Sequence, residues 1–111
     1  MDKLAFYRSC VQTLLESHGG SALDDNGVEM ALCFDSVRDR YLLMRVGWDG
    51  LNRVYHSVLH FDIKDGKVWL QQNTTDIDVG VELMELGVAK EDIVLGLHPP
   101  YKRFYAGYGM T

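Results

Sequence analysis

Apolar side chains recur at every second position through much of residues 28–72, and this alternation restricts the fold more than any other feature of the chain. Successive side chains of a β-strand point to opposite faces of its sheet, so the alternation predicts strands with one apolar face. The predicted apolar rows are Val28, Met30, Leu32 and Phe34; Leu42, Met44, Val46 and Trp48; Tyr55, Leu59, Phe61 and Ile63; and Val68 and Leu70. Turn-forming residues separate these rows, which predicts a four-stranded antiparallel meander.

The last predicted turn, Lys64-Asp65-Gly66-Lys67, sets the register of the third and fourth strands. Asp-Gly accepts the two positive φ angles of a type I′ turn, whose twist suits a tight hairpin. The expected cross-strand pairs are Ile63 with Val68, Phe61 with Leu70, Asp62 with Trp69 and His60 with Gln71. A shift of one residue would exchange the two faces of the sheet, so we expect this register to be strongly specified.

A helix precedes the predicted sheet. Apolar residues at helical spacing predict it over residues 2–18, with Asp2 as its N-cap. Gly19-Gly20 is expected to end it, because glycine adopts the left-handed cap conformation at little cost.

Further helical segments follow the sheet. A second helix is expected from Asn73-Thr74-Thr75-Asp76 to about Leu86, with Gly87 as its stop. Gly80 lies inside this helix, which suggests a close approach to the sheet. Within residues 88–95 we expect a short helical turn that leads into an extended apolar segment, Ile93-Val94-Leu95. The prolines at 99 and 100 favour extended backbone after it.

These patterns predict an α+β fold with an N-terminal helix, a four-stranded antiparallel meander sheet and two C-terminal helical segments packed on one sheet face. The length of 111 residues corresponds to one domain, spanning residues 1–111. No apolar run approaches the ~18 residues of a membrane span, and the N-terminus does not resemble a signal peptide. We therefore expect a cytoplasmic protein with no membrane contact, in which Cys10 and Cys33 are reduced thiols.

The charge of the chain argues against non-specific nucleic-acid binding, because the formal net charge is -5. The charge is unevenly distributed. Residues 36–72 carry more basic than acidic side chains, whereas residues 76–92 are strongly acidic. Any DNA contact is therefore expected to be indirect.

The second face of the predicted sheet is too apolar to be an ordinary solvated surface. Its expected members are Glu29, Ala31, Cys33, Tyr41, Leu43, Arg45, Val54, His56, Val58, His60, Asp62, Trp69 and Gln71. Two short helical regions can cover only one face well, so either the C-terminal tail or another polypeptide covers this one. We expect a homodimer, a higher oligomer or a heteromeric contact here.

Titratable residues on this second face invite a metal or acid–base interpretation, but their spacing opposes it. His56 and His60 are four strand residues apart, about 13 Å, which is too far for one ion. His60 and Asp62 lack a third ligand, so a hydrogen-bonded polar patch is the favoured interpretation. The sequence also lacks the short motifs of nucleotide, zinc-protease and serine-hydrolase sites. We therefore expect no metal, no cofactor and no catalytic residues.

Four stretches of the chain together resemble a known family. They are MDKLAFYRSCVQTLLE, RDRYLLMRVGWDG, RVYHSVLHFDIKDGKVWLQQNTTDI and GVAKEDIVLGLHPPYKR. They resemble the XisI family of fdxN element excision controlling factors, known chiefly from cyanobacteria. The matching positions are Trp48, Arg53, His60, Asp62, Asp65, Gly66, Trp69, Asp92, His98, Pro99, Pro100 and Arg103. Ala89 stands where a proline often precedes Lys-Glu-Asp in the family, and the aromatic tail after Arg103 has no match.

The resemblance implies an accessory factor for programmed excision of a DNA element, with a separate site-specific recombinase cutting the strands. It also implies a protein partner of the XisH type and no catalytic residues. The residues expected to bind that partner are Arg45, Arg53, His56, His60, Asp62, Trp69, Gln71, His98, Tyr101 and Arg103.

Two other functions remain open at this stage. A directionality factor could bind DNA directly through Arg38, Arg40, Arg45 and Arg53. A small-ligand or metal-binding domain resembling an enzyme could instead be built around His60, Asp62 and Trp69.

Overall fold

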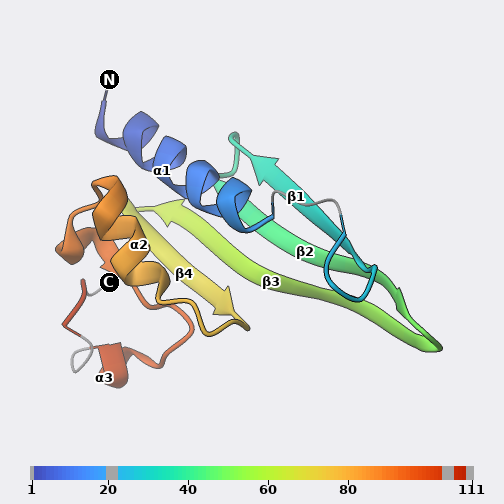
Figure 1. Ribbon diagram of the computed structural model, residues 1–111. Coiled ribbons are helices and arrows are strands. Elements are labelled where there is room, and N and C mark those ends of the chain that lie inside the picture. Colours follow the sequence, from blue (N-terminus) through green and yellow to red (C-terminus); the bar gives the residue numbers. More distant parts are fainter. Residues whose placement is uncertain (1, 20–22, 104–106, 110–111) are drawn as a thin grey trace.

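The computed structural model describes residues 2–19, 23–103 and 107–109 as a five-stranded sheet with two main helices on one face (Figure 1). The strands lie in sequence order across the sheet. They are β1 (Glu29–Asp35), β2 (Arg40–Asp49), β3 (Asn52–Lys64), β4 (Lys67–Asn73) and β5 (Ile93–Val94). The helices are α1 (Lys3–His18), α2 (Val79–Leu86), the 3-10 turn η1 (Lys90–Asp92) and α3 (Pro100–Arg103). None of the described helices is long and apolar enough to cross a membrane.

The predicted antiparallel meander is confirmed for β1 to β4, but the sheet has a fifth strand. Strand β5 pairs with β4 in parallel, placing Ile93 beside Val68 and Val94 beside Trp69. The extended conformation predicted for Ile93 and Val94 is thus confirmed. Two residues are too few to show alternation, so the sequence pattern did not reveal that they join the sheet. The predicted hairpin turn is also confirmed, because Asp65 and Gly66 have φ angles of 55° and 75°.

Helix α1 begins as predicted, with the Asp2 carboxylate accepting a hydrogen bond from the Ala5 N–H at 2.8 Å. Its end differs from the prediction, because Gly19 has φ −106° and is not left-handed. A Cβ at Gly19 would lie 2.6 Å from Leu43 Cδ1 and 3.1 Å from Leu32 Cδ2. Glycine at this position therefore allows close packing of the helix end on β1 and β2.

Helix α2 begins at Val79, later than predicted, with Asp78 as its N-cap. The Asn73 carboxamide accepts hydrogen bonds from the Thr75 N–H and hydroxyl, and its amide donates to the Ile77 carbonyl. These bonds form a turn that competes with the helix, as short polar side chains commonly do. The predicted left-handed stop at Gly87 is confirmed, with φ 112°.

The structure reverses the predicted orientation of β2. Tyr41 and Leu43, assigned to the second face, are 0% and 1% exposed in the core beneath the helices. Leu42 and Met44, assigned to the core, are half-buried on the opposite face. Residues 41–44 are all apolar or aromatic, so their alternation carries no information about which face is buried.

Two β-bulges shift the faces of β3 and β4. The first follows Leu43 in the β2–β3 ladder, and it leaves both Val58 and Leu59 in the core. It also places His56 and His60 on opposite faces, which corrects the prediction that they share one. The second bulge pairs His60 with Gln72, whereas the predicted partner was Gln71.

The C-terminal segment contradicts two further expectations. Pro100–Arg103 forms a single helical turn after Pro99, where extended backbone was predicted. Proline suits the first position of a helix, because its missing N–H would have no helical partner there. The atoms nearest to a Cβ at Gly80 belong to the Tyr108 ring in the tail, whereas the sequence suggested the sheet. Phe104 and Tyr105 lie outside the described residues.

Candidate binding surface

The sheet has an inner face, covered by α1 and α2, and an outer face on the other side (Figure 1). The outer face takes its residues from β1 to β4, according to the pairing of the strands. They are Glu29, Ala31, Cys33, Arg40, Leu42, Met44, Val46, Trp48, Arg53, Tyr55, Ser57, His60, Asp62, Trp69, Gln71 and Gln72. Cys33 is an exposed thiol and Cys10 a buried one, and the two do not form a disulfide with each other.

A hydrogen-bonded polar group lies at the middle of this outer face. His60 Nε2 is 2.8 Å from Asp62 Oδ1, and the Gln71 amide donates to Asp62 Oδ2 at 3.2 Å. The side chains of His60 and Asp62 are 23% and 16% exposed. No lysine or arginine among the described residues forms an ion pair with Asp62. Its carboxylate is therefore held in place and remains able to meet a cation from another molecule.

The described residues contain no group of three or more metal-ligating side chains. Within the same ranges, His60 and Asp62 have no third metal-ligating side chain beside them.

The C-terminal arm, residues 95–103, covers one end of the outer face. The Arg103 guanidinium lies 5.3 Å from the Trp69 ring centroid, and Lys64 Nζ lies 4.0 Å from it. Arg103 Nε donates to the carbonyls of Leu95 and His98. Trp69 is consequently only 5% exposed. The predicted covering by the tail is thus confirmed at Trp69, where the described part of the C-terminal segment lies over the ring.

The arm presents several side chains outward from Trp69. Tyr101 is 69% exposed, and His98 and Lys102 are also exposed. A groove of about 280 Å³ lies between the arm and α2. Its lining includes Leu70, Ile77, Leu95, Leu97 and His98. The arm therefore combines basic and aromatic groups beside an apolar recess.

The hairpin tip is the far end of β2 and β3, where Trp48, Leu51, Arg53 and Tyr55 gather. Trp48 is 60% exposed, Tyr55 67% and Leu51 96%. The Arg53 guanidinium lies 5.6 Å from the Trp48 ring and 5.9 Å from the Tyr55 ring. The predictions assigned Trp48 and Tyr55 to the core row. Their cross-strand positions opposite Arg53 and Val46 instead place them outside.

The four arginines considered for DNA binding do not form one patch. Arg45 lies on the inner face opposite His56, and its Nε is 2.7 Å from Asp24. Arg38 pairs with Asp35 at 3.2 Å. Hydrogen bonds from the Val28 backbone and from Arg45 keep the pKa of Asp24 below its usual value. The structure therefore divides these arginines between two faces and neutralises two of them.

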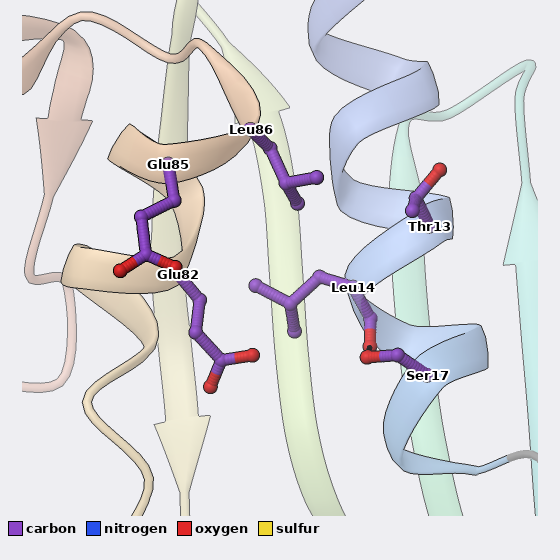
Figure 2. A pocket seen from close by; sticks show the side chains of 6 residues that line it. All are labelled: Thr13, Leu14, Ser17, Glu82, Glu85 and Leu86. Atoms are coloured by element: carbon purple, nitrogen blue, oxygen red, sulfur yellow. Dashed lines mark hydrogen bonds between the residues drawn. The ribbon is translucent and has the colours of Figure 1, made fainter.

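A second groove, of about 180 Å³, lies between α1 and α2 on the helical side (Figure 2). Thr13, Leu14 and Ser17 of α1 face Glu82, Glu85 and Leu86 of α2 across it. Glu82 already pairs with His18 at 2.8 Å, and the Ser17 hydroxyl donates to the Leu14 carbonyl. Several polar groups of this groove are therefore used within the fold, and we do not assign it a ligand.

These contacts define the class of the protein, a small α+β protein whose prominent feature is a partly covered sheet face with a basic C-terminal arm. Residues 1–110 match the family described as XisI protein. A XisI-like protein from Anabaena variabilis ATCC 29413 has a similar structure, with 50% identity and a TM-score of 0.90 over 97% of this chain and 99% of that one. No curated protein gives a significant match.

A second crystal structure from the same organism is also similar, that of the fdxN element excision controlling factor XisI. It shares 33% identity with a TM-score of 0.86, over 99% of this chain and 100% of that one. The chain described here belongs to the XisI family. The family resemblance read from the sequence is thereby confirmed.

Proposed function

We propose that this protein is a non-enzymatic controlling factor for the programmed excision of a DNA element, acting through a protein partner of the XisH type. The observation that carries the proposal is membership of the XisI family, together with a relative named as an excision controlling factor. In this scheme a separate site-specific recombinase cuts and joins the strands. This protein determines whether the assembly forms.

The proposed docking surface for the partner is the C-terminal arm with the neighbouring end of the outer face. It comprises Trp69, Gln71, His98, Tyr101 and Arg103, which the sequence also indicated. Tryptophan, tyrosine and arginine are the residues that most often dominate binding energy at protein interfaces. Here Trp69 is buried, and the Arg103 guanidinium lies over its ring. Tyr101, in the same arm as Arg103, is 69% exposed.

The chemistry of the arm indicates the character of the partner's surface. Lys102 and Arg103 are basic, and His98 and Tyr101 are both exposed. An acidic patch with an apolar recess for Tyr101 would complement them, because opposite charges speed encounter and exclude wrong partners. Arg45 and His56 lie on the inner face, so they are not part of this surface.

The proposed contact with DNA is indirect. The net charge of -5 repels the phosphate backbone at long range. Arg38 and Arg45 are each paired with an aspartate, so they contribute little positive potential. In the proposed complex the partner, and the recombinase recruited with it, make the contacts with DNA.

Co-expression with the XisH-type protein of the same genome tests the proposal. We expect a stable complex by size-exclusion chromatography and a loss of affinity of about tenfold or more in Tyr101→Ala. Leu51→Ala is a control, because Leu51 is 96% exposed in the turn between β2 and β3 and belongs to neither proposed surface. It should bind the partner as the wild type does.

Two results would contradict this assignment. The absence of any complex at micromolar concentrations would remove the partner from the proposal. An equal loss in Tyr101→Ala and Leu51→Ala would remove the arm as the docking surface. Strongly salt-dependent binding of the purified protein alone to the element's DNA would instead support a directionality factor that contacts DNA directly.

A further inference from the structure

We propose that the outer face, beyond the part covered by the C-terminal arm, closes on a second copy of this chain through a two-fold axis that crosses the strands at Met44 and Ser57. Those two residues are paired across β2 and β3. The proposal concerns a different surface from the arm, and it does not depend on the proposed partner.

Apolar side chains along β2 and β3 give the outer face a surface that a second protein molecule would shield from water. Leu42, Met44 and Val46 are half-buried, and Trp48 and Tyr55 are 60% and 67% exposed. They form a continuous apolar strip on one face, because cross-strand neighbours and alternate residues share a face. Contiguous exposed apolar surface of this kind is characteristic of protein interfaces.

Charge complementarity between the two ends of the strip indicates which molecule covers it. One end carries Asp62, which has no lysine or arginine partner among the described residues. The other end carries Arg53, which among the described residues contacts two aromatic rings and the Gly47 carbonyl and forms no ion pair. A carboxylate and a guanidinium on one face, neither of them in an ion pair with an oppositely charged Lys, Arg, Asp or Glu among the described residues, are the elements of a self-complementary contact.

The register of the strands places these groups symmetrically. Trp48 pairs with Arg53, and Arg40 pairs with Asp62. On β2 each of these rows lies four residues from Met44, about 13 Å. The bulge at Val58 adds one residue to β3 between Ser57 and Asp62, so the cross-strand pairing remains symmetric about Met44 and Ser57.

A two-fold axis across the strands therefore brings complementary groups together between the two copies. Arg53 of each copy lies over Asp62 of the other, Trp48 over Arg40, and Tyr55 over His60. Arg40 forms no ion pair with any described residue, so its guanidinium is available to stack on an indole. Val46 lies over Leu42, and Met44 packs against its own symmetry mate.

The size of the contact is that of a small interface. Strands β1, β2 and β3 have 7, 10 and 13 residues, which at about 3.3 Å each and about 4.8 Å spacing give roughly 480 Å² per copy. The total of about 950 Å² is close to the roughly 1,000 Å² expected of a specific contact. The arm at Trp69 stands beside β3 on β4, so it flanks the second copy and remains accessible.

Charge reversal at the two ends of the strip tests this geometry directly. The wild type should be a dimer by sedimentation equilibrium. In Arg53→Glu two carboxylates would meet at each contact, and in Asp62→Arg two guanidinium groups would meet. Each change should raise the dissociation constant by about a hundredfold, because both symmetric contacts become repulsive. Arg38→Glu is the matched control, since Arg38 is exposed outside this face, and it should remain dimeric.

Mixing the two variants provides the decisive measurement. A heterodimer of Arg53→Glu with Asp62→Arg has opposite charges at both contacts, so dimers should return on mixing, and the double variant should dimerise alone. This recovery also shows that each variant is folded. A monomeric wild type at 100 micromolar, or dimers in both single variants, would overturn the proposal. So would failure of the mixture and of the double variant to recover dimers.

Discussion

The inner and outer faces of the sheet are built from the same strands and yet differ in almost every physical respect. Beneath α1 and α2, Tyr41, Leu43, Leu59 and Phe61 are 0% or 1% exposed. On the outer face, apolar side chains such as Leu42 lie beside His60 and Asp62, which are hydrogen-bonded to each other. The inner face therefore supplies folding free energy, whereas the outer face retains groups that can bind another molecule.

The comparison teaches that apolar content alone does not identify a core. Leu42 and Leu43 are neighbours of identical chemistry, and only the position of α1 distinguishes their surroundings. A Cβ at Gly19 would touch Leu43 Cδ1, which shows how closely the helix end lies above it. Leu42 has no helix above it and stays half-buried.

The sharpest way to break this comparison is a matched pair of truncations. Leu43→Ala should lower the free energy of unfolding by about 3 kcal/mol, because it leaves a cavity beneath α1. Leu42→Ala should cost about 1 kcal/mol or less. Urea unfolding measures both free energies, at a protein concentration low enough to keep the chain monomeric. Equal losses of unfolding free energy in the two variants would show that the two faces are not energetically distinct.

The sequence predicted the four-stranded meander, the register next to Asp65-Gly66, the cap of α1 and the end of α2. These features depend on local chemistry, such as the positive φ angles of Asp65 and Gly66. The extended segment at Ile93 and Val94 was also predicted, but its parallel pairing with β4 was not, since that pairing arises from the tertiary fold.

The errors at the binding surface have a common physical origin. Alternation assigns faces correctly only where it is uninterrupted, and the bulge at Val58 exchanges the faces of all residues before it on β3. His56 was consequently grouped with His60, and Tyr55 with the core. The apolar run of Tyr41 to Met44 likewise has no polar residue to indicate which side faces water.

The second prediction concerns the hydrogen bond between Tyr7 of α1 and Asp92 in the C-terminal half of the chain. The buried Tyr7 hydroxyl donates to Asp92 Oδ2 at 2.6 Å and accepts from the Ala89 N–H at 3.4 Å. Tyr7→Phe should therefore cost about 1.5 kcal/mol of stability by thermal or urea unfolding. Tyr101→Phe, at an exposed position, should have no measurable effect. An unchanged free energy of unfolding in Tyr7→Phe would mean that the Tyr7 hydroxyl bonds as favourably to water in the unfolded chain as to Asp92 and Ala89 in the folded one.

The same tie predicts a pH dependence. Burial opposes ionisation of Asp92, but hydrogen bonds from Lys3 and Tyr7 outweigh it and lower the pKa below the ordinary 3.8. As the pH falls, Asp92 takes up its proton more readily in the unfolded chain than in the folded one. The stability that the ionised Asp92 contributes above about pH 4 is therefore lost below it. Asp92→Asn should be less stable at pH 7 and should lose less stability between about pH 5 and pH 3. An unchanged slope would contradict the lowered pKa.

The fourth prediction tests the contact between α2 and the tail. Gly80 should gain about 1 kcal/mol of helix propensity when replaced by alanine. The added methyl group would collide with the Tyr108 ring, so the gain should disappear in the wild-type background. In a Tyr108→Ala background Gly80→Ala should be stabilising. A double-mutant cycle measures the coupling, which we expect to be about 1 kcal/mol, and additive effects would show that the tail does not hold Tyr108 there.

The smallest effect is expected at the hairpin tip, where the two tryptophans of the chain offer a matched comparison. Trp48 is 60% exposed and Trp69 is 5% exposed, although both lie on the outer face. Trp48→Ser should change the stability of the monomer by about 0.5 kcal/mol, since it loses mainly its contact with Arg53. Trp69→Ser should cost several times more, because it removes the ring that Lys64 and Arg103 cover. If Trp48→Ser nevertheless weakens self-association, the hairpin tip contributes to binding and not to folding. A large loss of monomer stability in Trp48→Ser would instead make the tip part of the folding core, and the division between the two faces would then fail at its most exposed end.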